Sequence, residues 1–383
     1  MGEERSIDRR TFVRAAGIDA LRAAVAVVDA SRALQAAGIR AALGIDEEAI
    51  ATFESAAEPV APFEARSAAT SDRIAADGAE LAHMLRGHLV GDGPVLGPIA
   101  VHALAGTAAE LVEQDAVART NALRATAAIL TAIRPASAAL ELSVRRAEAV
   151  WAPLADTDAP TIAQSLTALA ESMTAELARN IDELASRLAG YVVGAVRGER
   201  GVLVYGPFGA ASTGSPSIAR QFAAALRAAG ADPVHWVPEG GPAGDGLRTA
   251  SDLADAGMPN RLIADASVAA LLVAGRIGVV VVAPHRVTGG GSVVAPLGTY
   301  QTAVMAALHG VPYVVAATSM TLPAESVGEP ATPGSWAPAE PANRLDARWL
   351  ERVRGVAPPV DEIPPELVSQ VVSDDRPSRP SGP

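Results

Sequence analysis

The sequence predicts an α/β fold class: a helical N-terminal domain followed by a Rossmann-like, doubly wound domain with a parallel sheet. Residues 277–282 form an apolar run without polar alternation, which is typical of a strand buried on both faces. Residues 311–316 repeat this pattern about one helix length later, as expected for parallel neighbours joined by a helix. From residue 201 onward, strand and helix patterns alternate, and this order favours a parallel sheet covered by helices.

The expected elements of the α/β domain follow one another with short loops between them. Glycine or proline stands at most of the junctions, which supports the assignment of loops there. We place this domain at residues 196–350 and a C-terminal extension at 351–383, in which residues 360–372 can still dock and the proline-rich end is expected to be disordered. The expected strands are 202–205, 233–237, 261–264, 277–282 and 311–316, and the expected helices are 216–229, 247–256 and 268–273.

Residues 1–195 are expected to form the helical domain. Apolar residues recur there, in several segments, at the three- and four-residue spacing of a buried helix face. Residues 161–192 form the longest such segment, and we expect a hinge to the second domain at residues 194–201. The expected buried side of the long helix consists of Ile162, Leu166, Leu169, Met173, Leu177, Ile181, Leu184 and Leu188.

Composition excludes several classes of protein and site. The chain has 383 residues, a formal net charge of -12 and a pI near 5.0, which argues against nucleic acid or an anionic membrane as the partner. It contains no cysteine, so disulfides, thiolate nucleophiles and cysteine metal sites are excluded. None of the six histidines belongs to a metal-ligand motif, and we expect no metal and no cofactor. No segment reaches the roughly 18 uninterrupted apolar residues of a membrane span.

Residues 8–14 carry a short motif around Arg9 and Arg10 that resembles a twin-arginine export signal. The apolar core that should follow such a motif is interrupted by Asp19 and Arg22, and no small-residue cleavage site stands out. An amphipathic helix with exposed arginines is therefore the favoured interpretation, and we expect a cytoplasmic protein.

The loop at residues 206–215 lies between a predicted strand and a predicted helix. Small residues there let backbone N–H groups approach a phosphate beside Gly209, and Ser212 and Thr213 could add hydroxyl donors. The loop matches neither the glycine motif of dinucleotide-binding proteins nor the lysine motif of the P-loop. A tight turn before a capped helix is an equally good interpretation.

Charged residues follow other predicted strands, and ligands of open parallel sheets bind beyond the carboxyl ends of the strands. His285 could act as an acid or base and Arg286 could hold an anion, or the two could be a solvated pair in a surface loop. Asp265 could be an acid, a base or a hydroxyl acceptor, or it could cap the following helix. In the helical region, Arg134 could bind an anion or pair with a surface carboxylate.

A series of short motifs runs through residues 202–323 in a fixed order. In their order and spacing they resemble the C-terminal domain shared by methylthioribose-1-phosphate isomerase, ribose-1,5-bisphosphate isomerase and the regulatory subunits of eukaryotic initiation factor 2B. The motifs are Gly257-Met258-Pro259, Leu262-Ile263-Ala264-Asp265, Gly275-Arg276-Ile277, Gly289-Gly290-Gly291-Ser292-Val293, Leu297-Gly298-Thr299-Tyr300 and His309-Gly310-Val311-Pro312-Tyr313.

This resemblance implies a helical N-terminal domain, a Rossmann-like C-terminal domain and a homodimer. It also implies a small phosphorylated metabolite as the ligand, with Gly290, Gly291 and Thr299 as candidate binding positions. A weaker likeness extends into the helical region at residues 93–97.

The catalytic positions of the isomerases are occupied differently here. Their His-Cys-Asn triplet, whose cysteine is catalytic, corresponds to Tyr205-Gly206-Pro207, and their Gly-Ala-Asp-Arg motif, whose aspartate is catalytic, corresponds to Ala283-Pro284-His285-Arg286. Their Asn-Lys pair corresponds to Ala295-Pro296, and the arginine of their Arg-Gly-Ala-Pro loop falls at Gly91. Loss of a positioned acid or base costs about 10²–10⁴-fold in rate, so we do not expect the isomerase mechanism unchanged.

Three functions are compatible with these departures. The first is a binding or regulatory protein with a degenerate site. The second is an active enzyme on a ribose-phosphate-like substrate, with His285 as the base in place of the aspartate. The third is an inactive subunit of a hetero-oligomer. A closed polar pocket formed by His285, Asp265 and Arg286 would favour the enzyme. If Pro296, Pro284 and Phe208 fill that space instead, binding is favoured.

Overall fold

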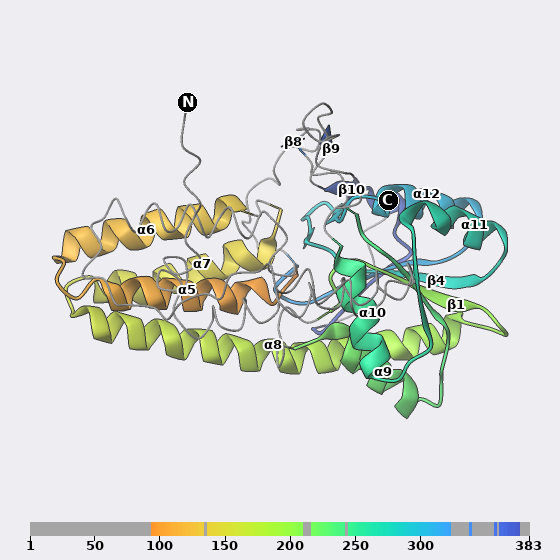
Figure 1. Ribbon diagram of the computed structural model, residues 1–383, viewed down its shortest axis with the longest axis horizontal. Coiled ribbons are helices and arrows are strands. Elements are labelled where there is room, and N and C mark those ends of the chain that lie inside the picture. The colour runs from red at the N-terminus through yellow and green to blue at the C-terminus, as the bar shows by residue number, and fades with distance from the viewer. Residues whose placement is uncertain are drawn as a thin grey trace, which may run out of the picture.

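The computed structural model describes residues 93–133, 136–209, 216–241, 244–322 and 360–375, together with two short strands at residues 337–338 and 356–357. Within these ranges, helices α5 to α8 lie alongside one another at the left of Figure 1, and a helix-covered sheet lies at the right. We call the two parts the helical unit and the sheet unit. The arrangement confirms the predicted fold class.

Polar side chains begin two helices of the helical unit. Ser137 Oγ accepts a hydrogen bond from the Leu140 N–H at 3.3 Å, and the Asp158 carboxylate accepts one from the Thr161 N–H at 2.7 Å. Each cap satisfies a backbone donor that the first helical turn leaves unpaired. The unit comprises α5 (Leu96–Glu110), α6 (Ala116–Ile133), α7 (Ala138–Trp151), the 3₁₀ turn η1 (Ala152–Leu154) and α8 (Ala159–Ala195).

Helix α8 has 37 residues and runs from the helical unit to the sheet unit (Figure 1). One side of it is buried along its whole length at intervals of three or four residues. The predicted buried side is confirmed, except that Leu169 is only partly buried and Ala170 takes the inner position. The helix packs against α5 in one unit and against α9 (Ile218–Ala228) and the sheet in the other. The expected hinge at residues 194–201 therefore begins inside α8.

The main sheet has six parallel strands in the order β11-β7-β4-β1-β2-β3 within the described part of the chain. The chain moves outward from β1 to β3 and then returns to the other side of β1, so the strand order reverses between β1 and β4. Open parallel sheets bind ligands at such a switch point. The strands are β1 (Gly201–Tyr205), β2 (His235–Pro238), β3 (Asn260–Ile263), β4 (Ile277–Val282), β7 (Tyr313–Ala317) and β11 (Gln370–Ser373).

Helices cover both faces of this sheet. Along β1, Val202 and Val204 pack in the core that includes α8 and α9, whereas Leu203 and Tyr205 pack in the core on the opposite face. Both faces are buried, which explains why the strands lack polar alternation. The opposite face is covered by α11 (Val268–Val273) and α12 (Thr299–Leu308), while α10 (Asp245–Asp255) packs beside α9 and β3.

Several short strands were missed by the sequence analysis. Arg286 begins a strand of a small antiparallel sheet rather than lying in a loop. β11 pairs with β7, so the main sheet includes residues beyond the expected boundary at 350. Segments of two to four residues are too short to carry a periodic pattern. The small sheet consists of β5 (Arg286–Val287), β6 (Val293–Ala295) and β10 (Asp361–Ile363), and β8 (Ala337–Pro338) pairs with β9 (Val356–Ala357).

Some expectations lie outside the described residues. These are the helical segments before residue 93, the Arg9-Arg10 motif, and the chain end beyond residue 375. In the portion that the structure describes, no helix is both long and apolar enough to cross a membrane.

Candidate functional site

The carboxyl ends of β1 and β4 lie next to each other at the switch point. Just beyond the paired strands, the Ala283 N–H donates to the Tyr205 carbonyl oxygen at 3.0 Å. The chain then turns at Gly206, whose φ is +107°. A Cβ at this position would lie 2.8 Å from the Ala283 carbonyl oxygen, closer than real Cβ atoms come. No residue with a side chain can replace Gly206 unless the backbone moves.

Apolar residues follow this turn. Pro207 is buried next to the start of the helical unit, since a Cβ on Gly93 would lie 3.3 Å from the Pro207 carbonyl oxygen. Phe208 is fully buried and belongs to the core that α8 and α9 share. Hydrophobic groups and close backbone packing therefore occupy the region beside the end of β1.

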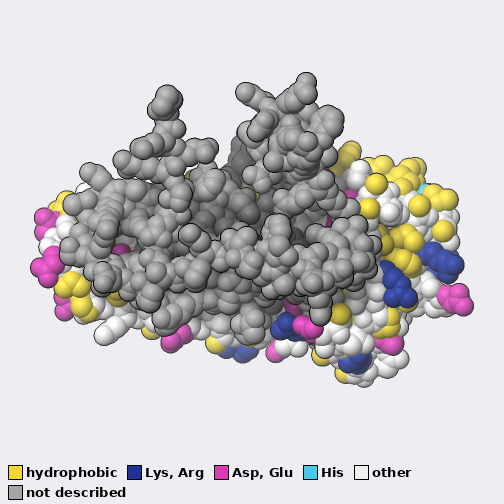
Figure 2. Space-filling view, viewed as in Figure 1, with side chains coloured by type: hydrophobic (Ala, Val, Ile, Leu, Met, Phe, Trp, Pro, Cys, Tyr) yellow, Lys and Arg dark blue, Asp and Glu magenta, His cyan; other side chains and the backbone are white. Residues whose placement is uncertain are grey.

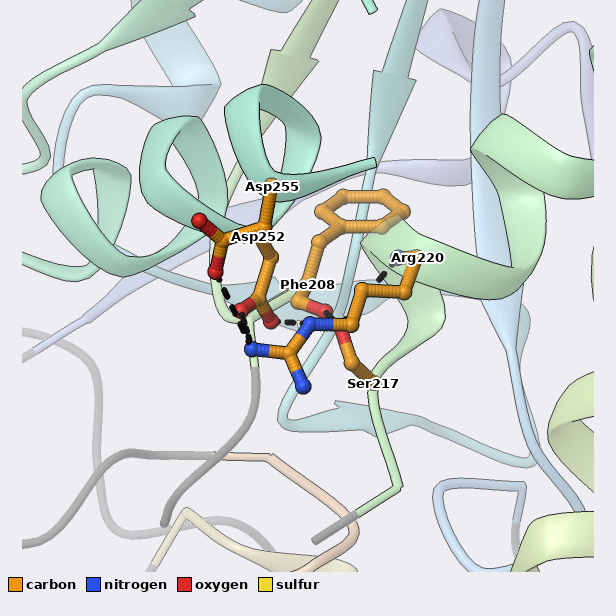
Figure 3. A network of polar contacts seen from close by, with 5 residues as sticks. All are labelled: Phe208, Ser217, Arg220, Asp252 and Asp255. Atoms are coloured by element: carbon orange, nitrogen blue, oxygen red, sulfur yellow. Dashed lines mark hydrogen bonds and ion pairs between the residues drawn. The ribbon is translucent and has the colours of Figure 1, made fainter. Parts of the chain in front are cut away.

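The far end of the same loop is held by a polar network (Figure 3). Ser217, the N-cap of α9, accepts a hydrogen bond from the Arg220 N–H at 3.2 Å and donates one to Asp252 Oδ2 at 2.5 Å. The Arg220 guanidinium pairs with Asp252 at 2.6 Å and with Asp255 at 3.4 Å. The Ser217 hydroxyl also lies 3.4 Å from the Phe208 carbonyl oxygen. Helix α10 thus fixes the start of α9 and the exit of the loop.

His285, which follows β4, lies where the sheet meets the helical unit. Its side chain is 6% exposed, and Pro284 before it is buried as well. The His285 N–H donates to the Val294 carbonyl oxygen at 2.9 Å, and its carbonyl oxygen accepts from the Ala138 N–H at 3.2 Å. The backbone of His285 therefore connects the small sheet to the first turn of α7.

The Arg286 guanidinium is buried and bound to the helical unit. Its Nη2 pairs with Glu141 Oε2 at 2.9 Å, and its Nε donates to the Ala136 carbonyl oxygen at 3.4 Å. Glu141 also pairs with Arg145 at 2.7 Å. These contacts join β5 to α7, and an anion at Arg286 would have to compete with the Glu141 carboxylate.

Asp265 lies at the end of β3, on the other side of the switch point. Its two carboxylate oxygens accept hydrogen bonds from the N–H groups of Gly240 and Gly241, at 2.9 and 2.8 Å. Successive backbone N–H groups of this kind can bind an anion, and here the protein's own carboxylate occupies them. The alternative interpretation as a helix cap is wrong, because η2 (Asp265–Ser267) begins at Asp265 with Ala264 in the cap position.

The Tyr205 hydroxyl connects the end of β1 to the start of α12. It donates to the Leu297 carbonyl oxygen at 2.8 Å. Burial raises the pKa of Tyr205, and the nearby carboxylates of Asp265 and Asp361 raise this pKa further. Asp361 of β10 accepts hydrogen bonds from two N–H groups at the start of α12, at 2.7 and 3.0 Å. A carboxylate thus already occupies the positive end of this helix.

The remaining predicted ligand positions also have structural contacts. Thr299 Oγ1 donates to the Pro296 carbonyl oxygen at 2.6 Å. Gly290 and Gly291 form the tip of the hairpin between β5 and β6, where Gly291 has a φ of +84°. Gly209 lies against α10, since a Cβ there would approach the backbone of that helix to 2.8 Å. None of these contacts by itself identifies a ligand.

Comparison with known proteins agrees with the predicted fold. The profile of the Initiation factor 2 subunit family matches residues 96–375. The chain belongs to this family. A methylthioribose-1-phosphate isomerase of Chloroflexus aurantiacus is 31% identical over 313 residues, which cover 78% of this chain and 86% of that protein. One of Dechloromonas aromatica is 31% identical over 245 residues, which cover 63% of this chain and 66% of that protein, slightly under two thirds of its length.

Two solved structures have a fold similar to that of this chain. The translation initiation factor eIF-2B of Pyrococcus horikoshii OT3 has a TM-score of 0.61 and 17% identity, over 79% of this chain and 97% of that one. The 5-methylthioribose 1-phosphate isomerase of the same organism has a TM-score of 0.60 and 19% identity, over 79% of this chain and 84% of that one. At such identities the likeness concerns the fold alone.

In the isomerases of the family that this sequence resembles, the catalytic cysteine falls at Gly206 and the catalytic aspartate at His285. The structure brings these two positions to neighbouring strand ends. The contacts of Arg286 and Asp265 instead lead to α7 and to the loop after β2, respectively. In the described part of the chain, no group of three His, Cys, Asp or Glu residues could hold a metal ion. Arg134, Ser212 and Thr213 lie outside that part.

The sequence analysis missed several polar contacts of this region. Ser217 carries a recognisable signal, a serine directly before a helical pattern. Its partner Asp252 lies 35 residues further along the chain, and Asp361 lies 61 residues from Tyr300. Local patterns do not identify partners at such separations.

Proposed function

We propose that this chain is a binding member of the Initiation factor 2 subunit family with a degenerate catalytic site, holding a phosphorylated sugar or a nucleotide-derived metabolite without isomerising it. The turn at Gly206 carries the proposal. The φ of +107° and the approach of the Ala283 carbonyl oxygen leave no room for a cysteine side chain there. A missing acid or base of this kind costs about 10²–10⁴-fold in rate.

The surroundings of the second catalytic position support the same proposal. An aspartate is replaced by His285, next to a buried proline, and Phe208 is buried at the neighbouring strand end. Arg286 is joined to Glu141, which reduces its availability for an anionic ligand. Neither strand end at the switch point therefore carries the acid or base that the resemblance assigns to the isomerases there.

The class of ligand is proposed from the fold and the relatives together. Ligands of open parallel sheets bind beyond the carboxyl ends of the strands at a switch point, and here the switch point lies between β1 and β4. The relatives with which this chain shares 31% identity are named for methylthioribose 1-phosphate. We place the binding site where residues 1–195, the helical domain, meet the α/β domain that begins at residue 196.

A second candidate function rests on His285. A buried histidine at the end of β4 stands where the isomerases have their aspartate, and a histidine can move protons near neutral pH. In this case the protein would interconvert an aldose phosphate and its ketose with His285 as the base.

One experiment separates the two functions. The melting temperature of the full chain is measured with methylthioribose 1-phosphate, ribose 5-phosphate, ribose 1,5-bisphosphate and AMP, and ketose formation is followed by NMR in the same samples. A ligand at 100 times its Kd stabilises the folded state by about 2.7 kcal/mol. We expect stabilisation by a sugar phosphate without turnover. Turnover at an ordinary enzymatic rate that His285→Ala abolishes would establish the second function instead, and the absence of any stabilisation would refute the first.

We also propose that the protein is a cytoplasmic homodimer. Figure 2 shows apolar side chains gathered at the right-hand end of the molecule, over α11 and α12. Val273 and Leu308, at the ends of these helices, are 69% and 72% exposed. Exposed apolar patches of this kind are typical of association surfaces. Light scattering on the purified chain tests the mass, and a monomer at micromolar concentration would contradict the proposal.

A further inference from the structure

Thr318, the residue that follows β7, has a buried hydroxyl without a partner. Its side chain is 1% exposed, and its Oγ1 makes no hydrogen bond to any residue that the structure describes. A buried hydroxyl that loses its water without gaining a partner destabilises the fold. Such a group calls for a physical explanation, and a bound molecule is one.

The neighbouring hydroxyl groups of Thr321 and Ser319 form hydrogen bonds, in contrast to the hydroxyl of Thr318. Thr321 Oγ1 accepts a hydrogen bond from the Thr318 N–H at 3.0 Å and donates one to the Thr318 carbonyl oxygen at 2.9 Å. Ser319 Oγ accepts one from Asn180 Nδ2 of α8 at 2.9 Å. The backbone of the turn is thereby fixed, and the Thr318 side chain is held in place with its polar atom unused.

The position of Thr318 connects it with the switch point. The last residues that pair between β4 and β7 are Val282 and Val315. His285 and Thr318 each follow this pair by three residues on their own strands. Side chains alternate along a strand, so Thr318 follows Val314 and Ala316 on the face covered by α8. This is the face on which the helical unit lies.

The helical unit also encloses the strand ends. A Cβ on Gly97 of α5 would lie 2.7 Å from Met320 Cε, two residues after Thr318. The Ala138 N–H of α7 donates to the carbonyl oxygen of His285, which follows β4. Gly93 packs against Pro207, which follows the turn after β1. The ends of β1, β4 and β7 therefore all meet the helical unit, and a small molecule held there would be largely removed from water.

We infer that Thr318 is a ligand-binding residue whose hydroxyl donates a hydrogen bond to an oxygen atom of a phosphorylated sugar. The inference rests on the proposed function and adds a group that recognises the ligand. A phosphate oxygen and a sugar hydroxyl both accept such a bond.

The test uses Thr318→Val, which keeps the shape and removes the hydroxyl, and Thr318→Ser, which keeps the hydroxyl. Thr126→Val is the matched control, because the Thr126 hydroxyl on α6 is also buried and has no partner among the described residues. Affinities for ribose 5-phosphate, ribose and inorganic phosphate are measured by thermal shift and calorimetry on the full chain. Ribose and inorganic phosphate show which part of the ligand the hydroxyl contacts.

We expect Thr318→Val to weaken ribose 5-phosphate binding by roughly tenfold or more, while Thr318→Ser and Thr126→Val bind as the wild type does. Without ligand, both valine variants should melt at or above the wild-type temperature. Equal affinity of Thr318→Val and the wild type would mean that the hydroxyl meets only an internal water, which would overturn this inference and leave the proposed function intact. A wild type that binds neither these probes nor any of the four ligands tested for the proposed function would overturn both. If the valine variant fails to fold, Thr318→Ala provides the same comparison.

Discussion

The loops that leave β1 and β4 are held in place by different kinds of contact. After β1, Ser217, Arg220 and Asp252 connect α9 to α10, and both helices belong to the sheet unit (Figure 3). After β4, Arg286 and Glu141 connect the small sheet to α7 in the helical unit. The first set of contacts stays within one unit, whereas the second joins the two.

This difference shows why a charged residue beside a strand end does not by itself mark a ligand site. Arg286 has the sequence position expected of an anion-binding arginine, but its guanidinium contacts Glu141 and the Ala136 carbonyl oxygen. The charged network after β1 likewise contacts the protein itself. It lies at the far end of its loop, where Ser217 contacts the backbone at the start of α9 and the Phe208 carbonyl oxygen. The two loops therefore differ in what their charges stabilise: an interface between units in one, and the start of a helix in the other.

The largest effect is expected from Arg286→Ala, which removes the contact between the units. The substitution leaves the partly buried Glu141 carboxylate without one of its two arginines, so we expect a loss of about 3 kcal/mol in the free energy of unfolding. Urea denaturation measures it. Arg124→Ala is the control, because its pair with Glu148 at 3.8 Å is exposed and should contribute less than about 0.5 kcal/mol. If both variants lose equally little, Arg286 does not join the units.

A smaller effect is expected from Asp252→Ala, which breaks the network after β1. Asp252 is buried and holds both the capping serine and Arg220, so we expect a loss of about 1–2 kcal/mol and faster amide hydrogen exchange at the start of α9. Asp255→Ala is a matched control, since that carboxylate is exposed and lies 3.4 Å from the same arginine. Equal exchange rates in the two variants would contradict the role given to Asp252.

The smallest effect is expected from His235→Gln, which changes how the stability of the protein depends on pH. His235 of β2 is buried edge-on against Phe222 of α9, with ring centroids 5.8 Å apart, and burial lowers its pKa below 6.5. The unfolded chain therefore binds this proton more readily, and stability is lost as the pH falls below about 6.5. We expect the free energy of unfolding to decline less between pH 7.5 and 5 in His235→Gln than in the wild type.

Burial also shifts the pKa values of His102 and Asp374, and both groups are present in the variant and in the wild type. Burial also lowers the pKa of His102, so part of the decline should remain in the variant. Burial raises the pKa of Asp374, and its contribution has the opposite sign, since it is present at low pH and lost as the pH rises. Identical pH profiles for the variant and the wild type would show that His235 does not contribute.

The parts of the fold that could be predicted are those with long, regular patterns. The buried side of α8 repeats every three or four residues over 37 positions, and β4 is a continuous apolar run, so both were found from the sequence. The strands β5, β6 and β10 have two or three residues each and depend on pairing between distant segments. Their existence follows from tertiary contacts, which no local pattern contains.

Only part of the candidate site could be predicted. The sequence analysis put Gly206 and His285 after two predicted strands, and the resemblance to the isomerases implied that both differ from the catalytic residues. That these two strands are neighbours follows only from the structure. That Arg286 binds Glu141, 145 residues away, could not be read from spacing. Nor does a glycine in the sequence reveal whether it is required; only the φ of Gly206 and the approach of the Ala283 carbonyl oxygen do so.

The continuity of α8 limits how a small molecule can enter. This one helix runs beneath both the helical unit and the sheet unit, so the two units cannot move apart without bending or breaking the helix. The ligand proposed for the strand ends would therefore have to enter by local movements within a unit, because α8 prevents the two units from separating.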